Sequence, residues 1–258
     1  MFYNKLVNKL QLADEYRRAH SRLLLLDYDG VLAPIMPLPE QAAPSQRTYE
    51  LLAKLAADKK NTCVVISGRD RQTLEDWLGH LPLAFAAEHG TWRREMDGVW
   101  ERIETAIRRL DWKREIRAVM EQYSAMLDGA FIEEKTAGVG IHYRTVRNQT
   151  EAEARMRQLV QELSPIAERL SLRILHGKKV IEVIPENTSK GAAARTWLGK
   201  SEWPFILAAG DDVTDEALFQ EVPERAWTIK VGEGETLARE RIGAQPEFIQ
   251  LLESLVVL

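Results

Sequence analysis

The sequence predicts an α/β protein with a mainly parallel sheet and a smaller α+β unit inserted into it. Short apolar runs recur along the chain and most end abruptly in polar residues, as strands buried on both faces of a parallel sheet do. Segments with helical spacing lie between these runs, which is the alternation expected of parallel strands joined by helices. The pattern changes between about residues 105 and 185, where two pairs of strands flank a long helix.

The expected elements of the larger unit alternate along the chain. They are a helix over 4–20, strands over 23–26, 62–66 and 83–87 with helices over 48–57 and 70–78 between them, a hairpin turn at 97–98, a helix from 190, strands over 205–209 and 226–231, and a helix over 248–255. The inserted unit is expected to contain helices over 112–127 and 150–170 and strands over 130–133, 139–143, 172–175 and 180–184. The predicted domains are a core, 1–104 and 186–258, and an insert, 105–185.

Composition predicts an ordinary soluble globular protein. The 258 residues are 45% hydrophobic and 29% charged with a formal net charge of -4, which argues against nucleic acid as a partner because its binding usually needs a basic face. No signal peptide is recognisable, and no apolar run approaches the ~20 residues needed to cross a bilayer. We therefore expect a cytoplasmic location and no membrane partner. The single cysteine, Cys63, lies in an apolar run and is expected in the core.

Two aspartates follow the strand formed by four leucines. Asp27 comes directly after residues 23–26 and is expected at the carboxyl end of that strand, where open α/β sheets bind ligands. Asp27 and Asp29 suit phosphoryl transfer, because one carboxylate can attack phosphorus while the other gives a proton to the leaving oxygen and later takes one from water. Acids this close repel each other, so we expect a cation beside them, and Mg²⁺ suits both oxygen ligands and a phosphate substrate.

The aspartate motif also has a structural interpretation. The segment from Asp27 to Gly30 is a good turn sequence and resembles the start of a calcium-binding loop. Such a loop needs further oxygen ligands at alternate positions, and the apolar residues 32–35 cannot supply them. Taken alone, the motif leaves the catalytic and the structural interpretation open.

Further polar residues follow the next predicted strands. Ser67, Gly68 and Arg69 come after the second strand, where a hydroxyl and free N–H groups can hold a phosphoryl oxygen, although Ser-Gly is equally a common turn. His89, after the third strand, is interpreted as a buried structural histidine. Lys190 is expected in the first turn of a helix, where a cation opposes the helix dipole. This placement indicates that it offsets the charge of a nucleophile and a phosphate, although a lone lysine is otherwise a surface residue.

A cluster of acids follows the strand over 205–209. Asp215 suits the first turn of a helix, where a carboxylate favours the dipole, but Asp211 and Asp212 have no such reason and a metal ion would explain them. In a parallel sheet the carboxyl ends of these strands meet at one edge. The aspartate pair, the serine, the lysine and the acidic cluster would then surround one point and form a complete phosphoryl-transfer site.

The insert carries charged residues on adjoining strands. By strand alternation Glu133 and Lys135 share a face, as do His142 and Arg144, and Glu182 lies on a further strand. One interpretation is a solvated face with weak cross-strand ion pairs. We favour a polar face that hydrogen-bonds sugar hydroxyls, because the charges cluster on neighbouring strands.

These motifs, in this order, resemble the haloacid dehalogenase superfamily of phosphatases, and within it the trehalose-6-phosphate phosphatase family, including the phosphatase domains of bifunctional trehalose synthesis enzymes. The matching segments are Leu25 to Gly30, Ile66 to Arg69, Glu88 to Gly90, Glu133 to Lys135, His142 to Arg144, Lys190 to Gly191 and Gly210 to Asp215. The resemblance implies a Rossmann-like haloacid dehalogenase core with a parallel sheet and an inserted α+β cap domain.

The resemblance also implies a role for each matching residue. The implied catalytic residues are Asp27 as nucleophile, Asp29 as acid/base, and Ser67 and Lys190 as ligands of the phosphoryl group. The implied Mg²⁺ ligands are Asp27, the backbone carbonyl of Asp29 and Asp211, with Asp212 or Asp215 helping directly or through water. The implied sugar-binding residues are Glu133, Lys135, His142, Arg144 and Glu182 of the cap and Gly68 and Arg69 of the core.

The implied function is Mg²⁺-dependent hydrolysis of trehalose 6-phosphate to trehalose and phosphate, with a trehalose-6-phosphate synthase as a potential partner. Val31 stands where this family usually has threonine, a change that the wider superfamily accepts. Three alternatives stay open: a phosphatase for another sugar phosphate such as sucrose or glucosylglycerol phosphate, a phosphotransferase or mutase, and a catalytically silent regulatory domain of a synthase complex. A silent domain would be expected to have lost the aspartates, and all are present.

Overall fold

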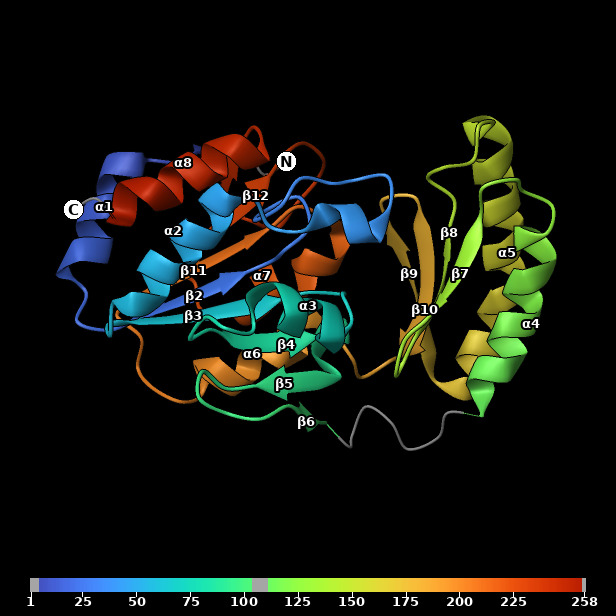
Figure 1. Cartoon of the computed structure of the whole chain (residues 1–258), viewed down its shortest axis with the longest axis horizontal. Coiled ribbons are helices and arrows are strands. Elements are labelled where there is room, and N and C mark those ends of the chain that lie inside the picture. Colours follow the sequence, from blue (N-terminus) through green and yellow to red (C-terminus); the bar gives the residue numbers. More distant parts are fainter. Residues whose placement is uncertain (1–4, 104–110, 257–258) are drawn as a thin grey trace. The chain divides into compact units, whose positions relative to one another are not determined.

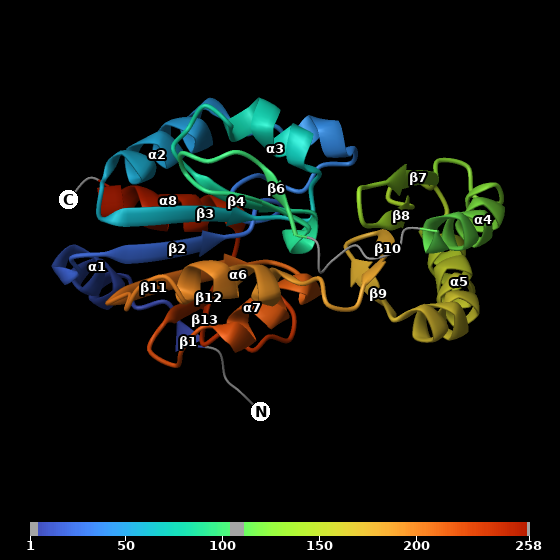
Figure 2. The ribbon, with the colours of Figure 1, turned by 90° about the horizontal axis from the view of Figure 1, so that it is seen from below.

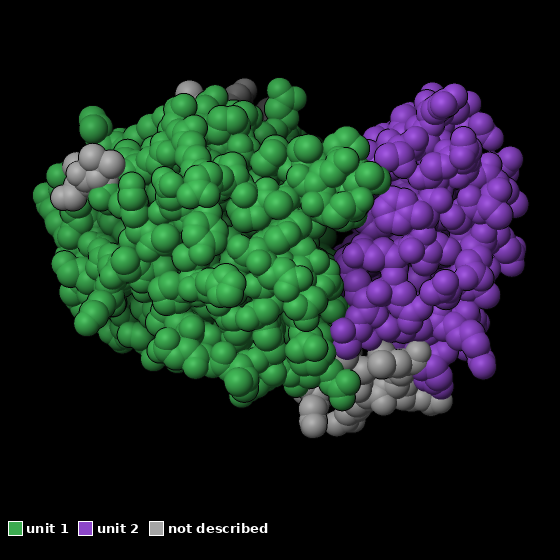
Figure 3. Space-filling model, in the orientation of Figure 1, with its two compact units in different colours: residues 1–102, 189–258 green, residues 103–188 purple. Residues whose placement is uncertain are grey.

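A computed structural model describes residues 5–103 and 111–256. The chain forms two compact units, the first made of residues 1–102 and 189–258 and the second of residues 103–188 (Figure 3). The predicted boundary between 104 and 105 lies outside the described residues, and the other, between 185 and 186, lies close to the observed division. Within the described residues, no helix is long and apolar enough to cross a membrane.

The first unit contains a mainly parallel sheet that confirms the predicted α/β class (Figure 1). In the described residues its strand order is β1 (Lys5–Leu6), β13 (Glu240–Ile242), β12 (Trp227–Val231), β11 (Phe205–Gly210), β2 (Arg22–Leu26), β3 (Asn61–Ile66), β4 (Ala84–Ala87), β5 (Trp92–Arg94) and β6 (Glu101–Arg102). Neighbours from β1 to β4 pair in parallel, whereas β5 and β6 are antiparallel additions at one edge. The strand that carries the aspartate motif is therefore central.

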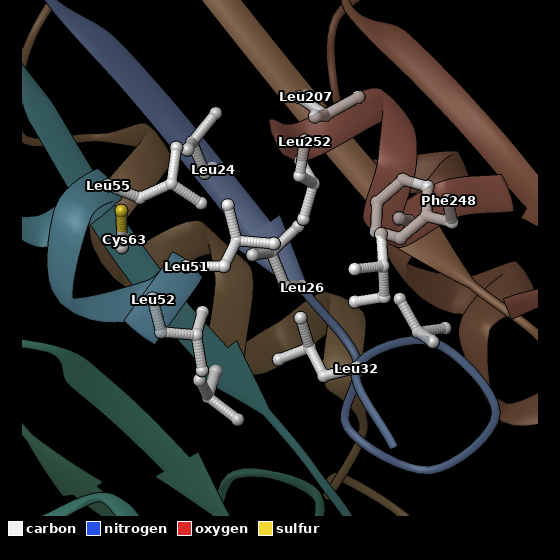
Figure 4. Packing of buried hydrophobic residues seen from close by; sticks show 14 of the residues in the cluster. Leu24, Leu26, Leu32, Leu51, Leu52, Leu55, Cys63, Leu207, Phe248 and Leu252 are labelled. Carbon is white, nitrogen blue, oxygen red and sulfur yellow. The ribbon is translucent and has the colours of Figure 1, made fainter. Parts of the chain in front are cut away.

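Helices cover both faces of this sheet (Figure 2). One face packs against α1 (Lys9–Arg18), α2 (Gln46–Ala57), α3 (Arg71–Leu78) and α8 (Gln245–Val256), and the other against α6 (Lys190–Leu198) and α7 (Glu216–Glu221). The leucines of β2 alternate between the two cores, with Leu24 and Leu26 in one and Leu23 and Leu25 in the other. Figure 4 shows Leu24 and Leu26 among side chains of α2 and α8. Strand β2 is thus buried on both faces, as its leucine run predicts.

The second unit is a four-stranded antiparallel sheet with two helices on one face, which confirms the predicted α+β insert. The strand order is β7 (Phe131–Glu134), β8 (Val139–His142), β10 (Val180–Pro185) and β9 (Leu172–Gly177), and the helices are α4 (Trp112–Ser124) and α5 (Gln149–Leu170). Ile141, Ile181 and Val183 pack with the helices in one core. Because side chains alternate along a strand, Glu182 lies on the opposite face.

The start of the chain differs from its prediction. The helix expected over 4–20 is the shorter α1, because the Asn8 side chain accepts a hydrogen bond from the N–H of Gln11 and caps the helix there. Residues 5 and 6 instead pair with β13 as an edge strand. Strand β13 was not predicted, because Ile242 is its only apolar residue and so gives no periodic signal.

Core packing by the central strand can be tested with a leucine pair. Leu24→Ala should lower the free energy of unfolding by about 2–5 kcal/mol, because Leu24 is fully buried and its removal leaves a cavity. Leu10→Ala on α1 is the control and should change it by less than about 0.5 kcal/mol, because Leu10 is 85% exposed. Urea unfolding measures both. Equal effects would contradict the assignment of β2 to the core.

Candidate active site

The carboxyl edge of the parallel sheet collects the polar residues that follow its central strands. Strand β2 lies between β11 and β3, and all three are parallel. Asp27, Ser67 and Asp211 are the first residues after β2, β3 and β11, so they lie at the same edge. Asp27 and Ser67 continue the ladder, since their N–H groups donate to carbonyls of β11 and β4 at 3.0 Å and 2.9 Å.

A buried lysine joins two of the carboxylates. Ser189 caps α6 by accepting a hydrogen bond from the N–H of Ala192, which makes Lys190 the first residue of that helix. The Lys190 Nζ lies 2.7 Å from Oδ1 of Asp27 and 2.7 Å from Oδ1 of Asp215. All three side chains are almost completely buried. The ammonium group of Lys190 therefore lies between two of the acids that follow the central strands.

Burial and mutual charge set the ionisation of this group. Burial raises the pKa of Asp27 well above its ordinary value, repulsion from Asp215 adds to this rise, and Lys190 opposes it. Burial alone would lower the pKa of Lys190, but the carboxylates of Asp215 and Asp27 outweigh burial and raise it. Lys190 therefore stays charged, and its ammonium group favours the ionised form of Asp27 against the effect of burial.

Asp215 organises the acidic loop after β11. Its Oδ2 accepts hydrogen bonds from the N–H groups of Asp211 at 2.9 Å and Asp212 at 3.0 Å, while its Oδ1 accepts from Lys190. Asp215 is fully buried, whereas the Asp212 carboxylate accepts from the N–H of Val213 near the surface. Asp212 and Asp215, between which the resemblance left the supporting metal role open, thus have different environments.

Three carboxylates lie close enough to share a cation. One oxygen each of Asp27, Asp211 and Asp215 lies within 4.8 Å of the others, and this is the group of potential metal ligands that the described residues contain. Gly30 has a φ of 79°, and a Cβ there would overlap the Asp211 carboxylate, so the turn after β2 accommodates that carboxylate only with glycine. An all-oxygen donor set of this kind suits a hard divalent cation such as Mg²⁺.

Arg69 binds the second aspartate of the motif. Its guanidinium donates to both carboxylate oxygens of Asp29, at 2.8 Å and 2.7 Å, and to the carbonyl of Pro39. The guanidinium also lies over the rings of Tyr28 and Trp77, 5.4 Å and 4.7 Å from their centroids. A bidentate pair held in this way fixes the direction of Asp29. Sequence reasoning gave Arg69 a sugar-binding role and missed this pair, which stacks against Trp77 of α3.

Ser67 is fixed by its own loop. Its Oγ accepts a hydrogen bond from the N–H of Arg69 at 3.1 Å, and the residue is 1% exposed. Because a hydroxyl can accept and donate together, its proton is left for another acceptor. Gly68 lies between Ser67 and Arg69 in the loop that follows β3 at the carboxyl edge of the sheet.

The second unit gathers charged residues on the sheet face opposite its helices. Lys135 Nζ lies 2.9 Å from Oε1 of Glu182 and 3.7 Å from Oε2 of Glu133, and His142 Nε2 lies 2.7 Å from the same Glu133 oxygen. Burial works to raise the pKa of Glu133, but Lys135 and His142 outweigh burial and lower it. In register, Gly140 of β8 lies between Glu133 and Glu182, so no side chain separates these acids.

Two features of this face escaped the sequence analysis. The ring of His142 stacks on Phe131, with centroids 4.7 Å apart and planes 4° apart. Strand alternation could have placed Phe131 on the same face as Glu133, two residues later. The glycine within β8 could have indicated a close approach of side chains from the neighbouring strands. Arg144 follows β8, and its guanidinium donates a hydrogen bond to the carbonyl of Lys178. This bond joins Arg144 to the turn between β9 and β10.

The first unit has a haloacid dehalogenase-like fold, with acids, a serine and a lysine at the carboxyl edge of its sheet. A solved haloacid dehalogenase-like hydrolase from B. subtilis shares this fold, with a TM-score of 0.58 over 92% of this chain and 99% of that chain at 13% identity. A model of the trehalose-phosphatase family matches residues 25–242. The chain therefore belongs to the trehalose-phosphatase family.

Individual relatives agree with this assignment. A bifunctional trehalose-6-phosphate synthase/phosphatase from Thermoproteus tenax is 40% identical over 247 residues, which cover 95% of this chain and 33% of that protein. The C-terminal domain of a C. albicans trehalose-6-phosphate phosphatase matches with a TM-score of 0.93 at 25% identity, over 99% of each chain. The chain spans about a third of the length of curated relatives that it matches.

The different environments of the two acids in the loop predict different tolerance of an amide. Asp215→Asn should lower the free energy of unfolding by about 3 kcal/mol, because an amide nitrogen would face either Lys190 or two backbone donors. Asp212→Asn is the isosteric control and should cost less than about 1 kcal/mol. Urea unfolding with a chelator present measures both, and equal losses would show that Asp215 does not organise the loop.

Proposed function

We propose that this chain hydrolyses trehalose 6-phosphate to trehalose and inorganic phosphate. The observation that carries the proposal is the buried ammonium group of Lys190 beside Asp27 at the carboxyl end of β2, in a chain of the trehalose-phosphatase family. The ammonium group favours the ionised carboxylate of Asp27, which is the form that can attack a phosphate ester, against the burial and neighbouring acids that raise its pKa.

In the proposed reaction Asp27 is the nucleophile. An oxygen of Asp27 attacks phosphorus, the bond from phosphorus to the sugar oxygen breaks, and protonated Asp29 gives that oxygen its proton. Asp29 then takes a proton from water while the water oxygen attacks the aspartyl-phosphate, which frees phosphate and restores Asp27. The pair with Arg69 fixes the direction of the Asp29 carboxylate.

The phosphoryl group would be held by Ser67 and Lys190. Ser67 has a proton to donate, and Lys190 carries the charge to balance the phosphoryl oxygens. Asp27, the backbone carbonyl of Asp29 and Asp211 would hold Mg²⁺, with Asp212 or Asp215 acting directly or through water. Bound Mg²⁺ would supply positive charge beside the phosphate. Both oxygens of Asp215 already accept hydrogen bonds, which favours an indirect role for this residue.

The polar face of the second unit would select the sugar. Glu133, Lys135, His142 and Glu182 present acceptors and donors in a fixed network, which suits the hydroxyls of a sugar. Arg144, and Gly68 with Arg69 on the first unit, would add further contacts. On this proposal residues 105–185 act as a cap that determines specificity and residues 1–104 and 186–258 as the catalytic core. A trehalose-6-phosphate synthase is the proposed protein partner, since the T. tenax relative is named as a bifunctional enzyme.

The proposal is tested by phosphate release from a panel of sugar phosphates, with Mg²⁺ and with a chelator. We expect Mg²⁺-dependent release from trehalose 6-phosphate, and Asp27→Asn should lower the rate by at least about 10³-fold without unfolding the chain, because the nucleophile is lost in a nearly isosteric change. Release from sucrose phosphate or glucosylglycerol phosphate alone would move the substrate assignment. A folded protein that is inactive on every ester would instead support a silent regulatory domain.

The sugar-binding role of the second unit has its own test. Lys135→Ala should lower kcat/KM for trehalose 6-phosphate by about 100-fold and leave that for a small aryl phosphate within about threefold, because only the sugar would contact this face. Arg169→Ala is the control, since Arg169 pairs with Glu115 on the helical side of the same unit. An equal loss on both substrates would count against a sugar site here.

A further inference from the structure

The turn after β4 has an unusual backbone. Glu88, His89 and Gly90 have φ values of 48°, 56° and 101°, so three consecutive residues are left-handed and two of them are not glycine. Such residues are strained, and they persist where the surroundings fix them. Glu88 and His89 are 5% and 6% exposed. The strain is therefore retained inside the first unit, next to the candidate active site.

The strained backbone of this turn binds the loop that carries Ser67. The N–H of His89 donates to the carbonyl of Ser67 at 3.0 Å, and the N–H of Glu88 donates to the carbonyl of Arg69 at 2.9 Å. The N–H of Ser67 donates in turn to the carbonyl of Ala86 at 2.9 Å. The Ser67 loop is thus fixed at both ends, and two of these bonds come from left-handed residues.

The side chain of His89 completes the contact. A Cβ added to Gly68 would lie 2.7 Å from Nε2 and 2.8 Å from Cε1 of His89, which is closer than real Cβ contacts. The imidazole therefore occupies the space over Gly68. On the other side of the turn, a Cβ on Gly90 would lie 2.8 Å from Cβ of Ala193, so this glycine permits the close approach of α6, the helix that begins at Lys190.

We propose that His89 is a positioning residue for the phosphoryl group, which deepens the proposed function and rests on it. Its backbone and ring fix the loop from Ser67 to Arg69, and with it the Ser67 hydroxyl that would bind a phosphoryl oxygen. The strained turn fits between this loop and α6, and thereby sets the position of Ser67 relative to Lys190. His89 is then still a buried structural histidine, but the segments that it supports carry Ser67 and Lys190, two groups of the proposed site.

The test is a double-mutant cycle on the contact between His89 and Gly68. His89→Ala should lower kcat/KM by about 10-fold and Gly68→Ala by about 100-fold, since small misplacements of a binding group cost this much. The loss from His89→Ala should be equal on trehalose 6-phosphate and on a small aryl phosphate, because the phosphoryl group is common to both. The double variant should be no worse than Gly68→Ala alone, since the vacated space admits the new methyl group. His80→Ala, at an exposed histidine, is the control and should match the parent protein.

Several results would overturn the proposal. Multiplying effects in the double variant would show that the two residues are not coupled. A lower melting temperature with an unchanged inhibition constant for inorganic phosphate would show a merely structural role. If His89→Ala does not fold, His89→Asn replaces it, because asparagine tolerates the left-handed backbone and lacks the ring.

One readout separates this proposal from the proposed function. If the parent protein hydrolyses no phosphate ester, the proposed function fails, and amide hydrogen exchange then decides the positioning role. His89→Ala should speed exchange at the amides of Glu88, Ser67 and Arg69 at least about 10-fold, whereas His80→Ala should not. Unchanged exchange at these amides would overturn the positioning role by itself.

Discussion

The structure of the first unit depends on one buried cation between two buried acids. Lys190 lies 2.7 Å from both Asp27 and Asp215, and none of the three has appreciable contact with solvent. Removing either sign from such a group leaves uncompensated charge in the interior. The central position of β2, the serine cap that starts α6 and the loop that Asp215 ties together all serve to bring these groups to one place. Burying these charges costs desolvation free energy, and their mutual attraction at one place offsets that cost.

The second unit repeats this arrangement on an antiparallel sheet. Lys135 lies 2.9 Å from Glu182 and 3.7 Å from Glu133, and Gly140 leaves the strand between them without a side chain. Each unit therefore places a lysine between two acids, at the carboxyl edge of the sheet in the first unit and on the sheet face opposite the helices in the second. In the first unit the fixed charges suit a phosphate, and in the second the fixed donors and acceptors suit hydroxyl groups.

Sequence reasoning reached the parts of the fold and site that local patterns encode. The leucine run of β2, the acids after β11 and the α+β insert follow from periodicity and composition. Strands β1 and β13 did not, because strands of two and three residues carry little apolar pattern and form only beside their neighbours. The contact between Arg69 and Asp29 joins residues 40 positions apart, and the contrast between Asp212 and Asp215 is one of burial. Both depend on tertiary packing, which no local pattern reports.

The most direct test of the central charge arrangement is the stability of Lys190→Met at two pH values with a chelator present. The pKa of Asp27 is raised even with Lys190 present. Without the lysine the acids should repel each other more, so the folded variant should gain stability as the pH falls and these acids take up protons. We predict that the variant loses several kcal/mol of unfolding free energy relative to the parent at about pH 7 and clearly less at about pH 5. A loss that is equal at both pH values, or no loss at all, would contradict this account.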